Sequence, residues 1–193
     1  MTVLPITYIG DPVLRTPTRP VTRDELADAA MQRFIDDLID TMRDAAGAGI
    51  AANQVGRSVR ICAVEVGEAT TRRYPYKPPI PLTVLVNPTL EYLGDDTYAN
   101  NEGCLSVPDL RGDLRRHIRV VATAWDRHGN DLLTKVAGLT AGTYQHEVDH
   151  LDGIIFVDRV EDTRSFSTWD EFDRHHRSHF VERITKFVDD IGS

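Results

Sequence analysis

Two histidines stand four residues apart in the segment QHEVDH, with a glutamate directly after the first: His146, Glu147 and His150. Because an α-helix turns about 100° per residue, the two imidazoles would lie one turn apart on one face. The pattern H-E-x-x-H is typical of metal-dependent hydrolases, in which the histidines hold a metal ion and the glutamate acts as a general base. An ordinary polar helix face is the alternative.

A third ligand would favour the metal site, because a catalytic site usually has three protein ligands and an open position for water. No residue downstream of His150 stands at the spacing that zinc proteases use. Cys104, in the upstream segment NNEGCLSVP, is the better candidate, since a thiolate binds a divalent cation strongly. A Cys/His/His set suits zinc or ferrous iron. The other cysteine, Cys62, lies in the alternating segment RICAVEV and is expected to be buried in a strand.

Composition limits the classes of protein to which this chain could belong. It has 193 residues, 41% of them hydrophobic, and a formal net charge of −8, which predicts one domain over residues 1–193. The acidic charge argues against direct nucleic-acid binding. We interpret the short basic run RRYPYK, residues 72–77, as solvated surface or local ion pairs. No apolar run is long enough to cross a membrane, and no signal peptide is recognisable, so we expect a soluble, cytoplasmic protein.

The candidate ligands must be positioned by a mixed set of helices and strands, an α+β outline. A capping box at Thr22 and Glu25, followed by apolar residues at helical spacing, predicts one long amphipathic helix that ends near Gly47. A second helix is predicted over 139–151 and a third from the capping box at Thr168. Strands are predicted over residues 60–66, 82–86, 117–125, 131–136 and 154–160.

Three segments together resemble the peptide deformylase family. GAGIAANQ (47–54), EGCLS (102–106) and QHEVDH (145–150) match, in the family's order, the motifs G-x-G-x-A-A-x-Q, E-G-C-L-S and H-E-x-D-H. The resemblance extends over about residues 5–160. It implies small antiparallel sheets packed around a central metal-bearing helix, with a long N-terminal helix and a C-terminal helix. It also implies a hydrolase that removes the N-formyl group from N-formylmethionyl peptides of newly made proteins and releases formate.

The resemblance implies one divalent metal ion per chain, bound by three ligands: Cys104, His146 and His150. In the family this metal is ferrous iron in cells, and zinc, nickel or cobalt can take its place. Glu147 is implied as the general base and later as the general acid. Gln54, through its side-chain amide, and Leu105, through its backbone N–H, resemble the family's donors to the tetrahedral oxyanion.

Other matched positions imply supporting roles. Gly49 and Gly103 are implied to bind the peptide main chain, and Arg111 to contact the peptide beyond its first residues. Glu102 and Arg116 match an ion pair that braces the cysteine loop, with an ordinary surface pair as the alternative.

Asp149 is a candidate to orient a ligand or a neighbouring loop. A solvated acidic residue is the alternative at this position.

The pocket for the first side chain of the substrate should depart from the family. Leu139, Gly142 and Thr143 precede His146 by one and two turns on the same helix face and are expected to form one wall. Gly142, like Asn100 before the second motif, stands where the family commonly has larger apolar residues. We therefore expect a roomier, more polar pocket with weaker selectivity for methionine. The alternative is that Gly142 only permits tight helix packing.

The C-terminal segment, residues 161–193, also departs from the family. It has five basic and eight acidic residues, whereas well-known bacterial members dock on the ribosome through a basic C-terminal helix. Ribosome docking is therefore uncertain, and the apolar stripe of this segment should pack on the domain or on a second subunit, giving a monomer or a homodimer. A deformylase with a specialised formylated substrate, a metallopeptidase and a catalytically silent metal-binding protein are the alternative functions.

Overall fold

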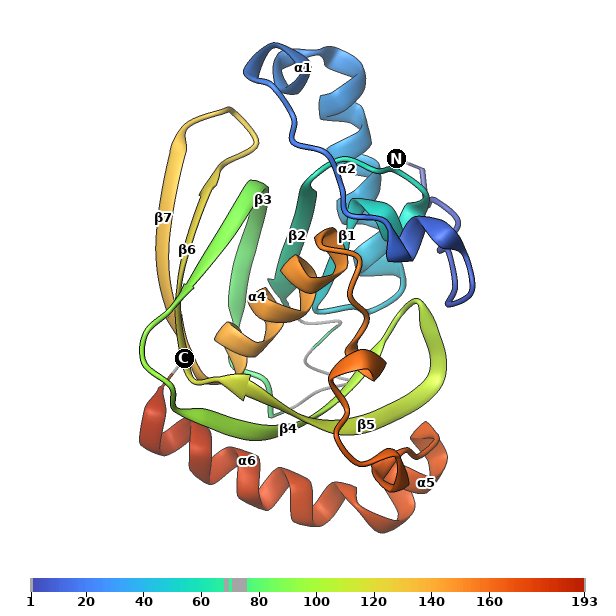
Figure 1. The fold of residues 1–193 in the computed structure, drawn as a ribbon, viewed down its shortest axis with the longest axis vertical. Coiled ribbons are helices and arrows are strands. Elements are labelled where there is room, and N and C mark those ends of the chain that lie inside the picture. The colour runs from blue at the N-terminus through green and yellow to red at the C-terminus, as the bar shows by residue number, and fades with distance from the viewer. Residues whose placement is uncertain (1, 68–69, 71–75, 193) are drawn as a thin grey trace.

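The computed structural model describes residues 2–67, 70 and 76–192 and has an α+β fold (Figure 1). A five-stranded antiparallel sheet, in the order β1-β2-β3-β6-β7, stands beside a two-stranded hairpin, β4-β5. The larger sheet consists of β1 (Gly49–Ala51), β2 (Ile61–Val66), β3 (Ile80–Tyr92), β6 (Arg119–Trp125) and β7 (Asp131–Ala137). The hairpin consists of β4 (Thr97–Cys104) and β5 (Val107–His117). The helices are α1 (Arg23–Ala27), α2 (Ala29–Asp44), α4 (Gly138–Leu151), α5 (Trp169–His175) and α6 (Arg177–Ile191), with short 3-10 turns at η1 (Pro12–Arg15), η2 (Ala52–Val55), η3 (Phe156–Arg159) and η4 (Thr163–Ser165).

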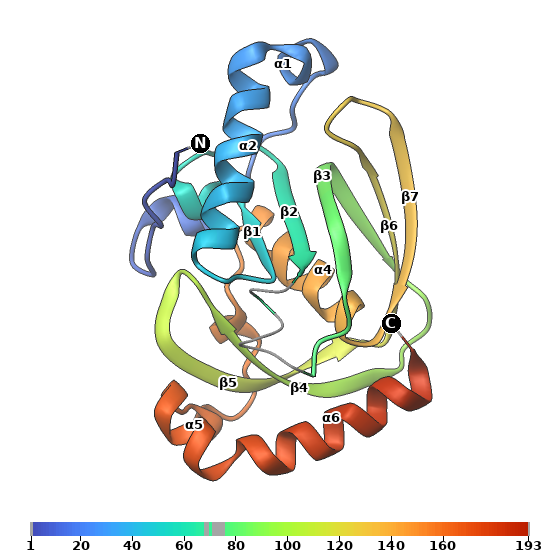
Figure 2. The ribbon, with the colours of Figure 1, turned by 180° about the vertical axis from the view of Figure 1, so that it is seen from behind.

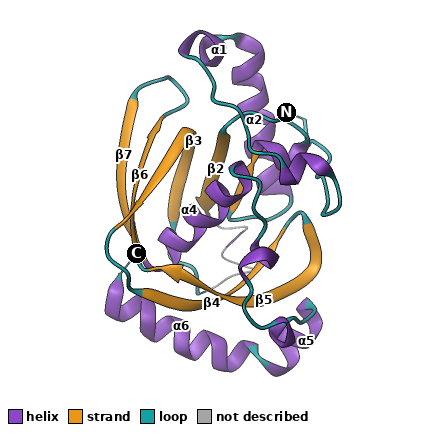
Figure 3. Cartoon of the chain, in the orientation of Figure 1, coloured by secondary structure: helices purple, strands orange, loops and turns teal. Residues whose placement is uncertain are grey.

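Helix α4 lies at the centre of the molecule, enclosed by the larger sheet and the hairpin (Figure 3). All its residues are buried except His146, which is partly exposed. A helix that is buried on every side belongs to the core and holds its side chains in fixed positions. The helix ends before Gly153, whose φ of 77° a residue with a Cβ adopts only at a cost. The predicted helix over 139–151 is therefore confirmed.

The two helices α2 and α4 cover opposite faces of β1 and β2 (Figures 1 and 2). Successive side chains of a strand point to opposite faces. Ile61 and Ala63 accordingly pack in the cluster that contains α2, whereas Cys62 and Val64 pack with Tyr144 of α4. The expected burial of the Cys62 thiol is confirmed.

The N-terminal helix is divided, contrary to the prediction of one continuous helix. The capping box of Thr22 and Glu25 is present and begins α1. Asp28 then adopts an extended conformation, and its side chain accepts a hydrogen bond from the backbone N–H of Ala30 at the start of α2. Asp28 therefore ends one helix and caps the next, because a short acidic side chain satisfies N-terminal N–H groups well.

The part of the chain that follows α4 differs from the prediction at two places. The predicted strand at 154–160 is wrong, since Phe156–Arg159 forms the turn η3 and the Asp158 carboxylate accepts the N–H of Ile155 at 2.8 Å. The third predicted helix is divided at His176 into α5 and α6. Figure 2 shows α6 along the outer side of the β4–β5 hairpin. Its residues Phe180 and Ile184 pack there in one cluster with Tyr98 of β4, Leu139 of α4 and Phe172 of α5.

The remaining predicted strands, 60–66, 82–86, 117–125 and 131–136, correspond to β2, β3, β6 and β7, of which β3 is much longer than predicted. Strands β1, β4 and β5 were not predicted. Within the described part of the chain, no helix combines the length and the apolar character that a membrane span requires.

Candidate active site

Cys104, His146 and His150 meet where the end of β4 reaches α4. One potential ligand atom from each lies within 4.8 Å of the other two, and Cys104 Sγ is 3.1 Å from His150 Nε2. Among residues 2–67, 70 and 76–192, no other cluster of three or more His, Cys, Asp or Glu side chains could hold a metal ion in this way. The thiol and the two imidazoles, held by a strand end and a core helix, fit a zinc or ferrous ion.

A buried ionic network fixes the orientation of His146. The carboxylate of Glu102, on β4, lies 2.8 Å from His146 Nδ1, so Nε2 is left to face the thiol. Arg116, on β5, donates two hydrogen bonds to Glu102 at 2.9 and 2.8 Å. Burial alone would raise the pKa of Glu102, but Arg116 and the hydrogen bond to His146 hold it well below its usual value. A carboxylate on the distal nitrogen is a common way of aiming a metal-binding histidine.

The same network continues to the C-terminal end of α4. Arg116 Nη1 lies 2.5 Å from Asp149 Oδ2, and Asp149 also accepts two hydrogen bonds from Arg159, each at 2.5 Å. Asp149 is buried, so it is not a solvated acidic residue.

Glu147 is buried beside the ligand cluster, and its Oε2 atom has no hydrogen-bond partner among the described residues. Burial raises the pKa of Glu147 to about 7, although the nearby charges of His146 and Lys77 oppose the shift. The carboxylate can pack here because Gly49 of β1 has no side chain. A Cβ at Gly49 would overlap the Glu147 carboxyl group.

The amide of Gln54 points towards the cysteine from η2. Its Oε1 accepts the N–H of Ala51 at 2.8 Å, which fixes the amide so that Nε2 faces the site. Nε2 lies 3.1 Å from Ser106 Oγ and 3.5 Å from Cys104 Sγ. Gln54 and Leu105 both line the cavity beside the three potential ligands.

Comparison with known proteins agrees with this geometry. The family model of polypeptide deformylase matches residues 3–166. The chain belongs to the peptide deformylase family.

The peptide deformylase of Heliobacterium modesticaldum is 46% identical over 83% of this chain and 96% of its own length. Peptide deformylase 2 of Ralstonia nicotianae is 39% identical over 90% of this chain and 98% of its own length. Among solved structures, a class I type b peptide deformylase of Acinetobacter baumannii with bound Met-Ala-Ser superposes with a TM-score of 0.78 at 36% identity, covering 82% of this chain and 99% of that one. Peptide deformylases are metal-dependent hydrolases that remove the N-formyl group from newly made peptides, and this chain is an enzyme of that family.

Two of the three predicted pocket residues line the deformylase cavity. Gly142 and Thr143 are in its wall, together with Asn100 from β4. Leu139 is not in the wall and packs in the apolar cluster under α6. The space that a side chain at position 142 would need is taken by Tyr98, because a Cβ there would overlap the phenol oxygen. Gly142 thus permits close packing of α4 on β4.

Arg111 and Gly103 lie on facing positions of the β4–β5 hairpin, and both line the cavity. Arg111 is only 2% exposed, and its Nε donates to Asn101 Oδ1 at 2.7 Å. The guanidinium lies over the rings of Trp169 at 3.9 Å and Phe172 at 4.5 Å. The C-terminal segment of this deformylase therefore covers Arg111 and adds Trp169 to the cavity wall.

Sequence reasoning missed several residues of this deformylase cavity, above all Lys77. Its basic run is predicted from the sequence to be solvated surface or local ion pairs. Lys77 instead lines the cavity, and its amine donates to the hydroxyl of Thr143 at 3.1 Å. Ser106 was missed as the partner of the Gln54 amide. The serine stands within the second motif, which was the available signal. Lys77 stands outside all three motifs, and no local pattern marks it.

Proposed function

We propose that this chain hydrolyses the formamide bond of N-formylated peptides, with Glu147 as the group that moves the proton. One observation carries the proposal: three potential metal ligands within 4.8 Å of one another adjoin a buried carboxylate that has an unpaired oxygen. A carboxylate held next to such a cluster, without a competing partner, suits general acid–base work.

The metal would be held by the Sγ atom of Cys104 and the Nε2 atoms of His146 and His150. We propose ferrous iron as the native ion, with zinc, nickel or cobalt able to replace it. When bound, a divalent cation would act as a Lewis acid and lower the pKa of water in the site. Glu102 supports this arrangement by accepting a hydrogen bond from the other ring nitrogen of His146, Nδ1.

The protein's own groups would then carry the proton and stabilise the charge. Glu147 takes a proton from a water molecule as the oxygen of that water attacks the formyl carbon. The amide of Gln54 and the backbone N–H of Leu105 donate hydrogen bonds to the carbonyl oxygen as it gains negative charge. The bond from the formyl carbon to nitrogen breaks, and Glu147 returns its proton to the departing amine. Formate and a peptide with a free N-terminus are the products.

The remaining site residues would hold the peptide and keep the catalytic groups in place. Gly49 and Gly103 line the cavity and would bind the peptide main chain, while Arg111, which stacks on Trp169, would contact the peptide beyond its first residues. The ionic network of Arg116 and Asp149 would keep Glu102 charged and aimed at His146.

We infer that residues 1–193 act as one catalytic domain, because α6 packs on α4 and β4 in a shared apolar cluster. The natural substrate would be the formylated start of newly made chains in the cytoplasm. A specialised formylated peptide is the alternative, which the polar lining contributed by Asn100 and Thr143 favours.

Formate release tests the proposal directly. Protein purified without oxygen is given formyl-Met-Ala-Ser, and unformylated Met-Ala-Ser serves as the matched substrate for peptidase activity. We expect formate from the first peptide and no cleavage of either peptide bond. Cleavage of Met-Ala-Ser without formate release from its formylated form would overturn the proposal in favour of a metallopeptidase.

A further inference from the structure

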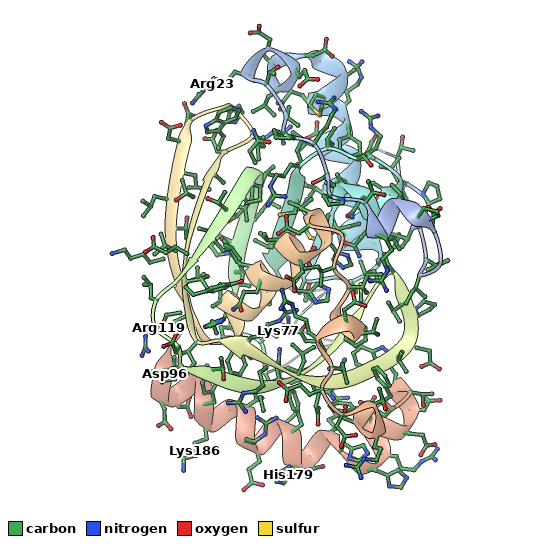
Figure 4. The ribbon with its side chains drawn as sticks, viewed as in Figure 1. Arg23, Lys77, Asp96, Arg119, His179 and Lys186 are labelled. Atoms are coloured by element: carbon green, nitrogen blue, oxygen red, sulfur yellow. The ribbon has the colours of Figure 1, made fainter. Side chains whose placement is uncertain are left out.

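Lys77 places an amine in the wall of the cavity that should receive the first side chain of the substrate. Figure 4 shows its side chain between α4 and the β4–β5 hairpin. Its Nζ donates to Thr143 Oγ1 at 3.1 Å, and the same hydroxyl donates to the carbonyl of Leu139 at 3.1 Å. Because the hydroxyl is anchored to the helix backbone, it holds the amine at a defined place one turn before His146.

The wall around this amine is polar. Asn100 lines the cavity from β4, and its Nδ2 donates to Glu102 Oε1 at 3.1 Å, so its amide is also fixed. Gly142 contributes no side chain. Lys77 and Glu147 both line this cavity. Lys77 thus belongs to the same cavity as the reacting groups.

A lysine amine in this wall changes which side chain fits best. An apolar side chain that enters would remove water from the amine and offer no acceptor in exchange, and unmade hydrogen bonds of buried polar groups are costly. A thioether sulfur is only a weak acceptor. An oxygen near the end of a side chain of the same length would accept an N–H and offset the lost hydration. A site built around such a hydrogen bond discriminates strongly against a substrate that lacks the bonding group. A hydrophobic pocket discriminates much less against a substrate that differs by one methylene.

We propose that Lys77 is a specificity-determining residue, which favours formylated peptides whose first side chain ends in an acceptor oxygen over those with an apolar side chain of equal length. This inference rests on the proposed deformylase function. Two sources share this chemistry: the sulfoxide of an oxidised methionine, which is neutral, and the terminal amide or carboxylate of glutamine or glutamate.

The test compares formyl-X-Ala-Ser peptides in which X is norleucine, methionine sulfoxide, glutamine or glutamate. Norleucine is the apolar reference of matched length. For each peptide, kcat/KM is measured with the wild type, Lys77→Met and Lys135→Met. Lys135 is exposed on β7 and controls for the loss of a positive charge. We expect the ratio of oxygen-bearing to norleucine substrate to fall about tenfold or more in Lys77→Met and to stay unchanged in Lys135→Met.

The individual peptides identify the source of the oxygen. A preference for glutamate alone assigns the effect to charge, whereas similar ratios for sulfoxide and glutamine assign it to hydrogen bonding. Binding of the deformylated products, Met(O)-Ala-Ser against Nle-Ala-Ser, is measured by calorimetry as a readout that needs no turnover. The same loss of discrimination is expected there. Lys77→Gln, which keeps a donor, replaces Lys77→Met if that variant does not fold, and a smaller fall in the ratio is then expected.

Two results would overturn the inference while leaving the proposed function intact. Unchanged ratios in the Lys77 variants would show that the amine does not read the side chain. An equal rise for every peptide would show that Lys77 obstructs the cavity without selecting. Failure of the wild type to release formate from any formylated peptide, norleucine and methionine included, would overturn the proposed function together with the inference.

Discussion

The two sides of the cavity are built in different ways. On one side, Glu102, Arg116 and Asp149 form a buried network behind the three potential metal ligands, in which each charge faces an opposite charge. On the other side, Lys77 and Thr143 present polar groups to the space that a substrate would occupy. The first arrangement would fix the groups proposed to be catalytic, and the second could meet different substrate side chains. The comparison suggests that chemistry and selectivity are separable in this molecule.

The networked side should be the less tolerant of substitution. Removing one partner of a buried ion pair leaves the other charge without compensation in a medium of low polarity. On the substrate side, a changed group can be replaced by water or by a substrate atom.

The largest expected effect is on catalysis, from Glu147→Gln. The substitution keeps the shape of the side chain but removes the proton acceptor, so kcat should fall by about 10²–10⁴, the usual worth of a general acid or base. Metal content should stay near one ion per chain, because Glu147 is not in the ligand set. Single-turnover kinetics and elemental analysis of the same sample provide the measurement. A variant that lost its metal and still released formate at the wild-type rate would show that the role of Glu147 is misassigned.

Arg116→Met should give the largest loss of stability. Arg116 is 2% exposed and contacts both Glu102 and Asp149, so its removal leaves the buried Glu102 without a guanidinium partner and Asp149 with Arg159 alone. We expect the free energy of unfolding to fall by about 3–5 kcal/mol in urea denaturation. Arg115→Met is the matched control, because Arg115 is exposed on the same strand, and it should change stability by less than about 0.5 kcal/mol. Equal losses of stability in the two variants would mean that the buried network contributes no more to stability than an exposed arginine on the same strand.

The sequence predicts the candidate catalytic residues better than it predicts the strands around them. The candidate ligands, Glu147 and Gln54 stand in three short motifs, and α4 ends at a glycine, so the sequence marks these residues as candidates for one site. The hairpin could not, because β4 reads Thr-Tyr-Ala-Asn-Asn-Glu-Gly-Cys, with few β-branched residues and no alternation of apolar and polar residues. Its stability comes from pairing with β5 and from the apolar contacts of Tyr98 with α6, which are long-range.

Breaks inside predicted helices were missed for a related reason. The spacing of the apolar residues around Asp28 is compatible with one continuous helix. The helix is interrupted there because Asp28 caps the start of α2. Lys77 illustrates the same limit at the site, because a lysine in a basic run is usually solvated. Lys77 is partly buried, and its amine donates to Thr143, 66 positions away in the sequence.

A double substitution tests how the two sides meet at Gly142. Gly142→Ala should cost about 1–3 kcal/mol, since its Cβ would overlap the phenol oxygen of Tyr98. Tyr98→Phe removes that oxygen, which is buried and has no hydrogen-bond partner among the described residues, and should be nearly neutral. In the double variant the added Cβ would meet Tyr98 Cζ, now a ring carbon of phenylalanine, at 3.5 Å, an ordinary contact. Thermal or urea denaturation should therefore show the loss recovered. Additive losses would mean that the tyrosine is not what limits position 142.

The smallest expected effect concerns a pair far from the cavity, Arg43–Glu65, which links α2 to β2 with distances of 2.7 and 2.9 Å. The hydrogen bond from Arg43 lowers the pKa of Glu65, against the opposing effect of burial. A lowered pKa in the folded state means that the pair contributes stability above the unfolded pKa of about 4.3 and loses it as the pH falls through the folded value. Because Arg43 is half exposed, Glu65→Gln should cost at most about 1 kcal/mol at pH 7, far less than Arg116→Met. Urea denaturation of wild type and variant at several pH values should show the difference disappearing in acid. A difference that persists at low pH would assign the loss of stability to packing. The Arg43–Glu65 pair could then not serve as the exposed charge pair with which the buried network is compared.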